Sequence, residues 1–482
     1  MHFTSTRGGA PAVPLAEAIR AGAAPDGGLY MPAVDWAALG QAPSPQGGEG
    51  WGEGERAQRA SDVGEYSPSP NPLTQPSPPR GEGLESGARC DPGLDLPLPV
   101  FAARLLAPFF AGDALEAELE PICREALDIP VPLATPDPAK PGLKALELFH
   151  GPTGAFKDFG ARFLMSCFDR IGDPAAPLTV LAATSGDTGG AVGCAAEGKA
   201  AVRAFILYPK GRVSPFQELQ LTCWGAPVRA LEVEGDFDDC QRIAKAAFAD
   251  RRLAEAHRLT SANSINIGRL LPQMAYLAHA AGRLFAEAGE KPGLIVPTGN
   301  LGHGFAALYA RALGAPIGPV LLVTNANRTL LDWHRSGAYE PRAAIATMAN
   351  AMDVGAPSNF ERLVALPPAL RDVRVELVDD DAIRARIRSD YEVSGYVWCP
   401  HSATAAEAYA RLPDAEREGR PWIAAATAHP FKFAEAIEPL IGARIAPPPA
   451  LEAILGRKGH KRTIAPRLEA LVEALESESL AA

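Results

Sequence analysis

The sequence has no excess of positive charge. It contains 46 Lys and Arg residues against 57 Asp and Glu residues, which gives a formal net charge of −11. No basic stripe interleaved with aromatic residues offsets this balance, so charge argues against a nucleic acid or an anionic membrane as a partner. An anionic small molecule would have to be held by a local pocket and not by the overall field.

Several other signals are missing. The seven cysteines are scattered and include no Cys-x-x-Cys pair, which argues against a disulfide scaffold and a zinc site and predicts reduced thiols in the cytoplasm. No His-Glu-x-x-His spacing occurs among the nine histidines, so a catalytic metal has no support. The N-terminus has no basic segment followed by an apolar core, and the longest uncharged run, 293–310, contains four glycines. We therefore expect neither a signal peptide nor a membrane span.

What is present is the composition of a globular protein, with one exception. The 482 residues are 47% hydrophobic and 21% charged, which suits two or three lobes with substantial cores. Segment 41–97, however, is rich in Pro, Gly, Ser, Glu and Arg and cannot bury enough surface to offset its chain entropy. It is predicted to be a disordered insertion, with a partner-binding tail as the alternative. The rest divides into an N-terminal segment (1–40), a helical region (98–140), a two-lobed core (141–445) and a C-terminal helical segment (446–482).

The expected core alternates strands and helices. Six short, continuously apolar runs are the predicted strands: Leu178–Ala183, Ala204–Tyr208, Val228–Val233, Leu294–Val296, Val320–Val323 and Trp422–Ala426. Helical patterns occur at Ala191–Glu197, Asp238–Asp250, Ile267–Ala288 and Phe305–Leu313. This order predicts an α/β fold of two lobes with mostly parallel sheets covered by helices, the smaller lobe at about 178–235. Ligands in such folds bind beyond the carboxyl ends of the strands.

One lysine lies in a setting that suits a nucleophilic amine. Lys157 stands between a Gly/Pro turn at Gly151–Gly154 and an expected helix start, among apolar and aromatic neighbours. A lysine in such surroundings can lose its proton near neutral pH and attack a carbonyl group. The alternative is a surface lysine beside a turn.

Two glycine-rich loops each follow a predicted strand and precede a helical pattern. They are Thr184-Ser185-Gly186-Asp187-Thr188-Gly189 and Pro297-Thr298-Gly299-Asn300-Leu301-Gly302-His303-Gly304. This geometry points backbone N–H groups and a helix N-terminus at an anion. Two such loops and an apolar-flanked lysine suggest a phosphate-bearing aldehyde cofactor, pyridoxal phosphate. A third pattern, Gly193 to Lys199, lacks the Ser or Thr of a P-loop and closes a helix, so it predicts no nucleotide site.

Together these motifs resemble the threonine synthase family of pyridoxal-phosphate enzymes of fold type II. Further matches follow in the family's order: Ser5–Gly8, Ala24–Tyr30, Ser261–Asn266 with Arg269, Pro272 and Gln273, Asn350–Asp353, and Thr427–Pro430 with Lys432 and Phe433. The resemblance implies conversion of O-phospho-L-homoserine and water to L-threonine and phosphate. Gly154 departs from the family, in which a leucine is usual, and Leu301–Gly304 replaces a phenylalanine-containing run; we expect altered packing at both places.

The resemblance also implies roles around the cofactor. Lys157 would form the Schiff base with the cofactor and then act as the base that moves protons at the substrate. The cofactor phosphate would lie on the backbone N–H groups of Gly299, Asn300, Leu301, Gly302 and His303. Thr427 would face the ring nitrogen, although a helix cap is its alternative role. Asp187 would lie near the ring oxygen, where many fold type II enzymes carry asparagine and threonine synthases similar to this chain carry aspartate. Its charge state is open.

The substrate is expected on the other matched residues. Thr184, Ser185 and Thr188 would hold its carboxylate, and stabilisation of the turn is their alternative role. Asn263 and Arg269 are further substrate-binding candidates. The cations considered for the substrate's phosphate are Arg162, Lys210, Arg269 and Lys432, with Arg269 favoured because of its helical spacing from the Asn263 loop.

Two alternatives to this function stay open. The nearer is another pyridoxal-phosphate lyase of the same fold, such as a serine or threonine dehydratase, which needs no second phosphate site. The farther is a binding module without activity, although such a protein would be expected to have lost Lys157. The sequence indicates no oligomeric state.

Overall fold

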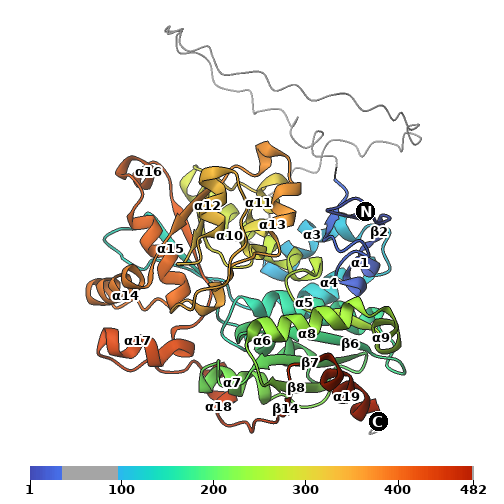
Figure 1. Ribbon diagram of the computed structural model, residues 1–482. Helices are drawn as coiled ribbons and strands as arrows, with labels where there is room; N and C mark the ends of the chain where they lie inside the picture. The colour runs from blue at the N-terminus through green and yellow to red at the C-terminus, as the bar shows by residue number, and fades with distance from the viewer. Residues whose placement is uncertain (35–95, 480–482) are drawn as a thin grey trace, which may run out of the picture.

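The computed structural model describes residues 1–34 and 96–479. The predicted insertion at 41–97 lies outside the described residues, except for its last two positions. The described chain forms two large, mostly parallel β-sheets with helices on both faces and a small antiparallel sheet near the N-terminus (Figure 1). The small sheet has the order β2-β1-β3, with β1 at His2–Ser5, β2 at Val13–Pro14 and β3 at Tyr30–Pro32.

The first large sheet has six strands in the order β12-β11-β10-β13-β5-β4. Their bounds are Arg374–Leu377, Val320–Thr324, Gly293–Pro297, Trp422–Ala426, Leu143–Glu147 and Leu133–Ala134. All neighbours pair in parallel except β4, which is antiparallel to β5. Every residue of β10, β11 and β13 is buried, which explains why these strands read as continuous apolar runs.

The second large sheet has five parallel strands in the order β14-β8-β7-β6-β9. Their bounds are Arg462–Ile464, Val228–Val233, Val202–Pro209, Leu178–Ala183 and Leu259–Ser261. Two of these strands, β9 and β14, lie outside 178–235. The smaller lobe therefore includes a strand from the C-terminal segment, which returns to pair with β8.

The helices are distributed along the whole described chain. Their bounds are α1 Leu15–Ala21, α3 Leu98–Phe110, α4 Leu119–Leu127, α5 Lys157–Ile171, α6 Asp187–Ala196, α7 Pro215–Thr222, α8 Phe237–Ala249, α9 Arg251–His257, α10 Leu271–Ala288, α11 Gly302–Ala312, α12 Thr329–Ser336, α13 Phe360–Ala365, α14 Asp380–Ser394, α15 Pro400–Ala410, α16 Asp414–Glu418, α17 Ala434–Ile441, α18 Pro449–Leu455 and α19 Leu468–Ser479. Short 3-10 turns occur at Glu116–Glu118, Ile267–Arg269, Asn350–Met352, Pro368–Leu370 and Pro430–Phe433.

Each large sheet is covered on both faces. Alternate residues of β10 belong to two different apolar clusters. Leu294 and Val296 are buried in the cluster that contains α10 and α11, and Ile295 is buried in the cluster that contains α14 and α15. In the second sheet, α8 and α19 pack on one face, and α5 and α6 pack on the other. The predicted α/β fold with mostly parallel, helix-covered sheets is thus confirmed. No helix among the described residues is long and apolar enough to cross a membrane.

All six predicted strands are present, with ends that differ by up to two residues. The helices differ more at their starts. The pattern at Ile267–Ala288 is a 3-10 turn followed by α10, whose second residue is Pro272, because proline suits the first turn of a helix. Helix α6 begins at Asp187, four residues before the predicted Ala191. Its glycines gave no helical signal in the sequence, but they let the loop turn directly into a helix.

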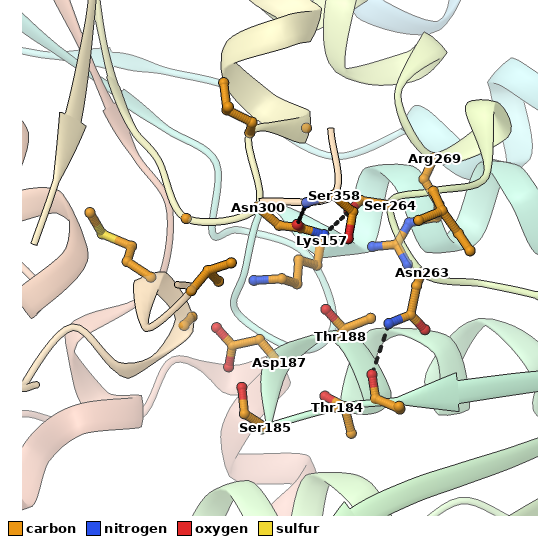
Figure 2. Close-up of a pocket in the computed structure, with 18 of the residues that line it drawn as sticks. Lys157, Thr184, Ser185, Asp187, Thr188, Asn263, Ser264, Arg269, Asn300 and Ser358 are labelled. Carbon is orange, nitrogen blue, oxygen red and sulfur yellow. Dashed lines mark hydrogen bonds between the residues drawn. The ribbon is translucent and has the colours of Figure 1, made fainter. Parts of the chain in front are cut away.

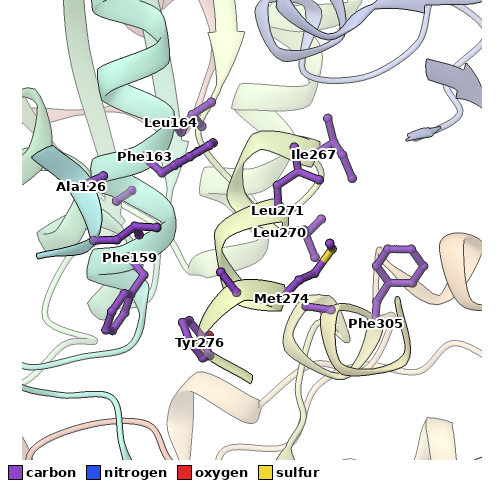
Figure 3. Close-up of a cluster of buried hydrophobic side chains, with 14 of the residues drawn as sticks. Ala126, Phe159, Phe163, Leu164, Ile267, Leu270, Leu271, Met274, Tyr276 and Phe305 are labelled. Atoms are coloured by element: carbon purple, nitrogen blue, oxygen red, sulfur yellow. The ribbon is translucent and has the colours of Figure 1, made fainter. Parts of the chain in front are cut away.

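A continuous apolar core fixes the position of α5. Phe159, Phe163 and Leu164 of this helix lie against the start of α10, where Leu271 and Met274 are buried in the same cluster (Figure 3). Burial of each such side chain contributes about 1.5–3 kcal/mol. Since Lys157 is the first residue of α5, this packing determines where its side chain begins.

Candidate active site

One pocket lies where the carboxyl ends of β6 and β9 meet those of β10 and β13. Apart from the candidate phosphate-binding cations Arg162, Lys210 and Lys432, its walls include every residue that the sequence predicted for the site: Lys157, Thr184, Ser185, Asp187, Thr188, Asn263, Arg269, Gly299, Asn300, Leu301, Gly302, His303 and Thr427. Figure 2 shows Lys157 extending between the loop of Asn300 and the loop of Ser185, Asp187 and Thr188. Strand ends from both sheets therefore build a single site.

Lys157 is held by backbone pairing on the side of its preceding loop. Phe156 N–H donates to Thr427 C=O at 2.8 Å, and Ala155 forms a β-bridge with Ala428. The Lys157 Nζ atom lies 4.8 Å from the centre of the Phe156 ring. Burial lowers the pKa of Lys157; Asp187 opposes this, and Arg269 adds to it, so that the pKa lies below its ordinary value. The neutral amine that carbonyl chemistry needs is thereby favoured.

Asp187 forms a buried ion pair with Lys432. Asp187 Oδ1 lies 3.0 Å from Lys432 Nζ, and the side chains are 3% and 0% exposed. Burial alone would raise the pKa of Asp187, but Lys432 and Lys157 outweigh it and hold the pKa well below its ordinary value. Asp187 is therefore a charged carboxylate. Lys432 is paired with Asp187 and does not line the pocket. It therefore does not face a substrate phosphate.

The loop at 299–303 forms a cradle of backbone donors. Among the described residues, none of the N–H groups from Gly299 to His303 donates a hydrogen bond, and α11 begins inside this loop at Gly302. A helix N-terminus with unpaired N–H groups suits a phosphate. Leu301 adopts a left-handed conformation with φ of 64°, a strain that is concentrated at functional sites.

Neighbouring loops hold this cradle in place. Asn300 Nδ2 donates to Ser264 Oγ at 2.8 Å, and Asn300 Oδ1 accepts from Ser358 N–H at 2.5 Å. A Cβ atom at Gly299 would lie 2.8 Å from Met352 Cα. Glycine at this position therefore lets the turn at Asn350–Met352 approach the loop.

The hydroxyl groups of the Thr184 loop differ in what they contact. Thr184 Oγ1 accepts hydrogen bonds at 3.0 Å from the N–H groups of both Gly186 and Gly189, so it stabilises the turn. In the part of the chain that the structure describes, the hydroxyls of Ser185 and Thr188 bond to no other residue, and both residues line the pocket. They are the better placed of the three to bind a ligand.

Thr427 follows β13 and lines the pocket beside His401. Thr427 N–H donates to Ser402 Oγ at 2.9 Å. His401 is buried at the start of α15, and its Nε2 accepts from Ala351 N–H at 3.0 Å. Burial lowers the pKa of His401 to about 4, against the effect of Asp187. The imidazole is therefore neutral at pH 7.

Arg269 is the one predicted phosphate-binding cation that lines the pocket. It is buried, its Nη1 donates to Ala262 C=O, and its Nε has no partner among the described residues. Burial lowers the pKa of Arg269 to about 10, with Asp158 acting in the opposite sense, so the guanidinium stays charged at neutral pH. Asn263 lies nearby and donates to Ala183 C=O at 2.9 Å.

The other two predicted cations lie elsewhere. Arg162 donates to the backbone carbonyls of Glu125 and Ala126, and Lys210 pairs with Glu234 at 3.0 Å on the surface. Neither lines the pocket. Both were candidates because they lie near matched motifs, but their side chains contact other groups.

Some lining residues gave no functional signal in the sequence. One face of α8 contributes Phe237, Gln241, Ala244, Lys245 and Phe248 to the pocket. Their spacing was that of an ordinary amphipathic helix over a sheet, so nothing marked them. Phe156, Gln273 and Asn350–Asp353 also line the pocket, and they stood in matched motifs without an assigned role.

Comparisons with known proteins agree with this geometry. The family profile described as pyridoxal-phosphate dependent enzyme matches residues 143–427, and the profiles for the threonine synthase N terminus and C-terminal part match 2–40 and 402–475. Threonine synthase from Serratia marcescens is 40% identical over 73% of this chain and 81% of its own length. The chain belongs to the threonine synthase family. The corresponding Escherichia coli protein is 39% identical over 71% of this chain and 79% of its own.

Solved structures of the threonine synthase family match over the full length. The crystal structure from Escherichia coli has a TM-score of 0.81 at 31% identity, covering 99% of this chain and 100% of its own. The pyridoxal-phosphate-bound threonine synthase from Brucella melitensis has a TM-score of 0.79 at 29% identity, covering 99% of each chain. The cofactor of this chain is thus pyridoxal phosphate, which fits the unpaired N–H cradle.

A threonine deaminase from Solanum lycopersicum matches less well. It covers 69% of this chain at 18% identity, with a TM-score of 0.50. A likeness at this level shows the fold alone. The comparisons therefore favour the threonine synthase family over the dehydratase alternative.

Proposed function

We propose that this chain converts O-phospho-L-homoserine and water to L-threonine and phosphate. The observation that carries the proposal is that Lys157 shares its pocket with two separate anion-binding features. One is the N–H cradle at 299–303, and the other is the buried, partly unpaired guanidinium of Arg269. A cofactor phosphate and a substrate phosphate need two such features, whereas a dehydratase needs one.

The cofactor supplies an electron sink for the negative charge that develops on the substrate carbons. Lys157 would hold the cofactor through its amine and, once freed by the substrate's amino group, would accept protons from Cα and Cβ. Protons would return to Cγ, which becomes the methyl group after phosphate leaves, and finally to Cα. This requires an amine that can change its protonation state near neutral pH, which burial of Lys157 favours.

The residues beside the cofactor ring would determine how strongly the ring withdraws electrons from the substrate. Thr427 would present its hydroxyl to the ring nitrogen, and a hydroxyl stabilises a pyridinium less than a carboxylate does. Asp187, held as an anion by Lys432, would lie near the ring oxygen. This combination suits elimination and replacement at the side chain more than transamination.

The substrate would be oriented by its two ends. The free hydroxyls of Ser185 and Thr188, at the N-terminus of α6, suit its carboxylate. Thr184 supports them from within the turn, and Asn263 lies between this loop and Arg269. Arg269 would hold the phosphate while it leaves Cγ and water adds at Cβ, because a guanidinium pairs well with phosphate oxygens.

An assay on the purified protein tests the function. O-Phospho-L-homoserine is added, and threonine and inorganic phosphate are followed together, with Lys157→Ala as the inactive comparison. Equal release of both products by the wild type, and neither product by the variant, is expected. Cofactor binding without either product, combined with ammonia release from serine or threonine, would instead support the dehydratase.

We also propose a cytoplasmic protein that needs neither nucleic acid nor a membrane, in keeping with its negative charge. The two lobes that meet at the pocket are proposed to close on each other when substrate binds, because closure limits side reactions with water. A pair of crystal structures with and without a substrate analogue tests this. Unchanged lobe positions in the pair would refute closure.

A further inference from the structure

The ion pair between Asp187 and Lys432 connects the two lobes of the molecule. Asp187 begins α6 after β6 of the second sheet, and Lys432 lies in the 3-10 turn after β13 of the first sheet. Their charged atoms are 3.0 Å apart, and both side chains are buried. A buried charge is costly unless it is paired, so each of these residues depends on the other.

Lys432 also contacts the loop that presents Lys157. Lys432 Nζ donates to Thr153 C=O at 2.7 Å. Thr153 in turn bonds to the Asp158 carboxyl group through its hydroxyl at 2.6 Å and its N–H at 2.9 Å. Since Asp158 is the residue after Lys157, a short chain of contacts joins Lys432 to the start of α5.

Few groups near Asp187 can balance its charge. Besides Lys432, the ionisable groups around it are Lys157, His401 and Cys399. Burial lowers the pKa of His401 to about 4 and raises the pKa of the Cys399 thiol, so both are neutral at pH 7. The carboxylate is therefore balanced by Lys432 or by Lys157.

The surroundings of the two lysines add little negative charge. Arg269 and Lys432 both disfavour a proton on Lys157. Lys432 faces Asp158, whose pKa is raised by burial despite its bonds to Thr153, together with His401 and His429, whose pKa values burial lowers to about 4. Asp187 is thus the main anion that Lys157 and Lys432 share.

We propose that Lys432 is a positioning residue that takes up the charge of Asp187 and so leaves the amine of Lys157 free to be neutral. Without Lys432, the remaining cationic neighbour of Asp187 would be Lys157, and the balancing proton would move onto its amine. Lys157 would then attack an aldehyde only at higher pH. The inference deepens the proposed function, which needs a neutral Lys157, but it concerns cofactor attachment and not turnover.

The test uses the apoenzyme and follows attachment of pyridoxal phosphate through the long-wavelength absorption of the lysine-linked cofactor. The attachment rate is measured against pH for the wild type and Lys432→Met. Because loss of one close cation leaves Lys157 beside an unshared carboxylate, the midpoint of the variant should rise by about one pH unit or more. If the pH midpoint of Lys432→Met equals that of the wild type, the proposal is overturned.

Two further variants separate this role from a general loss of structure. Asp187→Asn with Lys432→Met removes both buried charges, and its midpoint should return towards the wild-type value. Failure to return would show that the effect does not pass through Asp187. If Lys432→Met alone does not fold, the test rests on Asp187→Asn alone. The pH midpoint of cofactor attachment in Asp187→Asn should be equal to or lower than that of the wild type. A higher midpoint would overturn the proposal.

Lys210→Met is the matched control. Lys210 forms an ion pair with Glu234 at the same 3.0 Å separation, but both side chains are about half exposed and lie outside the pocket. Its midpoint should equal that of the wild type. An equal shift in this control would mean that any lost lysine produces the effect and would refute a specific role for Lys432. Absence of threonine formation with the expected midpoints would count against the proposed substrate and leave this inference standing.

Discussion

Leu451 fills the space into which a side chain at Gly154 would extend. A Cβ atom at Gly154 would lie 3.0 Å from Leu451 Cδ1, and Gly154 has a φ of 68°. The Leu451 side chain comes from α18 in the C-terminal segment, so this helix packs against the loop that precedes Lys157.

Gly154→Leu is expected to lower the free energy of unfolding by about 1–3 kcal/mol, because it overpacks the contact with Leu451 and places a side chain at positive φ. Adding Leu451→Ala to Gly154→Leu should recover part of this loss, since it removes the clash. Urea unfolding of both single variants and the double variant measures the coupling. Strictly additive effects would show that the two side chains do not compete for the same space.

Arg269→Ala is expected to reduce kcat/KM for O-phospho-L-homoserine by about 10- to 100-fold, since a charge-assisted hydrogen bond contributes about 1.5–3 kcal/mol. Arg269→Lys should be intermediate, because it keeps the charge and loses the planar fork. Steady-state phosphate release measures both. Arg251→Ala, at an exposed position of α9 outside the pocket, is the control and should match the wild type. Equal turnover by Arg269→Ala and the wild type would show that Arg269 does not hold the substrate's phosphate.

Glu125→Gln is expected to change the free energy of unfolding by an amount that depends on pH. Glu125 accepts bonds from Lys199 at 2.7 Å, Ser166 at 2.8 Å and Arg170 at 3.0 Å. Burial alone would raise the pKa of Glu125, but these contacts lower it to about 2. A carboxyl group whose pKa is lower in the folded state stabilises the protein above its unfolded pKa, about 4.3, and loses this contribution as the pH falls towards 2.

The variant should therefore be less stable than the wild type at pH 7, by no more than about 1 kcal/mol because Glu125 is partly exposed. The difference should shrink between about pH 4.3 and 2. Urea unfolding at a series of pH values measures it. Glu120→Gln, which removes an exposed pair with Arg124 on the same helix, should show little difference at any pH. A Glu125→Gln difference that stayed constant down to pH 2 would contradict this assignment.

The parts of the site that follow buried strands could be predicted from the sequence. The runs Leu178–Ala183 and Leu294–Val296 are apolar because both faces of each strand are covered. The glycine loops come directly after them, and parallel strands bring their carboxyl ends to one edge. This is why loops more than 100 residues apart in the chain line the same pocket.

The side-chain partners could not be predicted in the same way. Lys432 and Asp187 are separated in the sequence by most of the core, and only the placement of one lobe against the other brings them to 3.0 Å. The face of α8 that lines the pocket has the spacing of any helix on a sheet. Strand β14 has only three residues, two of them exposed, so neither length nor burial gave a signal.

The position of β14 has a consequence for how the protein is made. In the finished fold β8 is paired on both sides, by β7 and by β14. During synthesis from the N-terminus, β8 emerges from the ribosome long before Arg462–Ile464, so one edge of the second sheet stays open until almost the whole chain has been translated. An open edge is a template for pairing with other chains. Truncation just before β14 should therefore yield a protein that aggregates during expression, even though the residues lining the pocket are all still present.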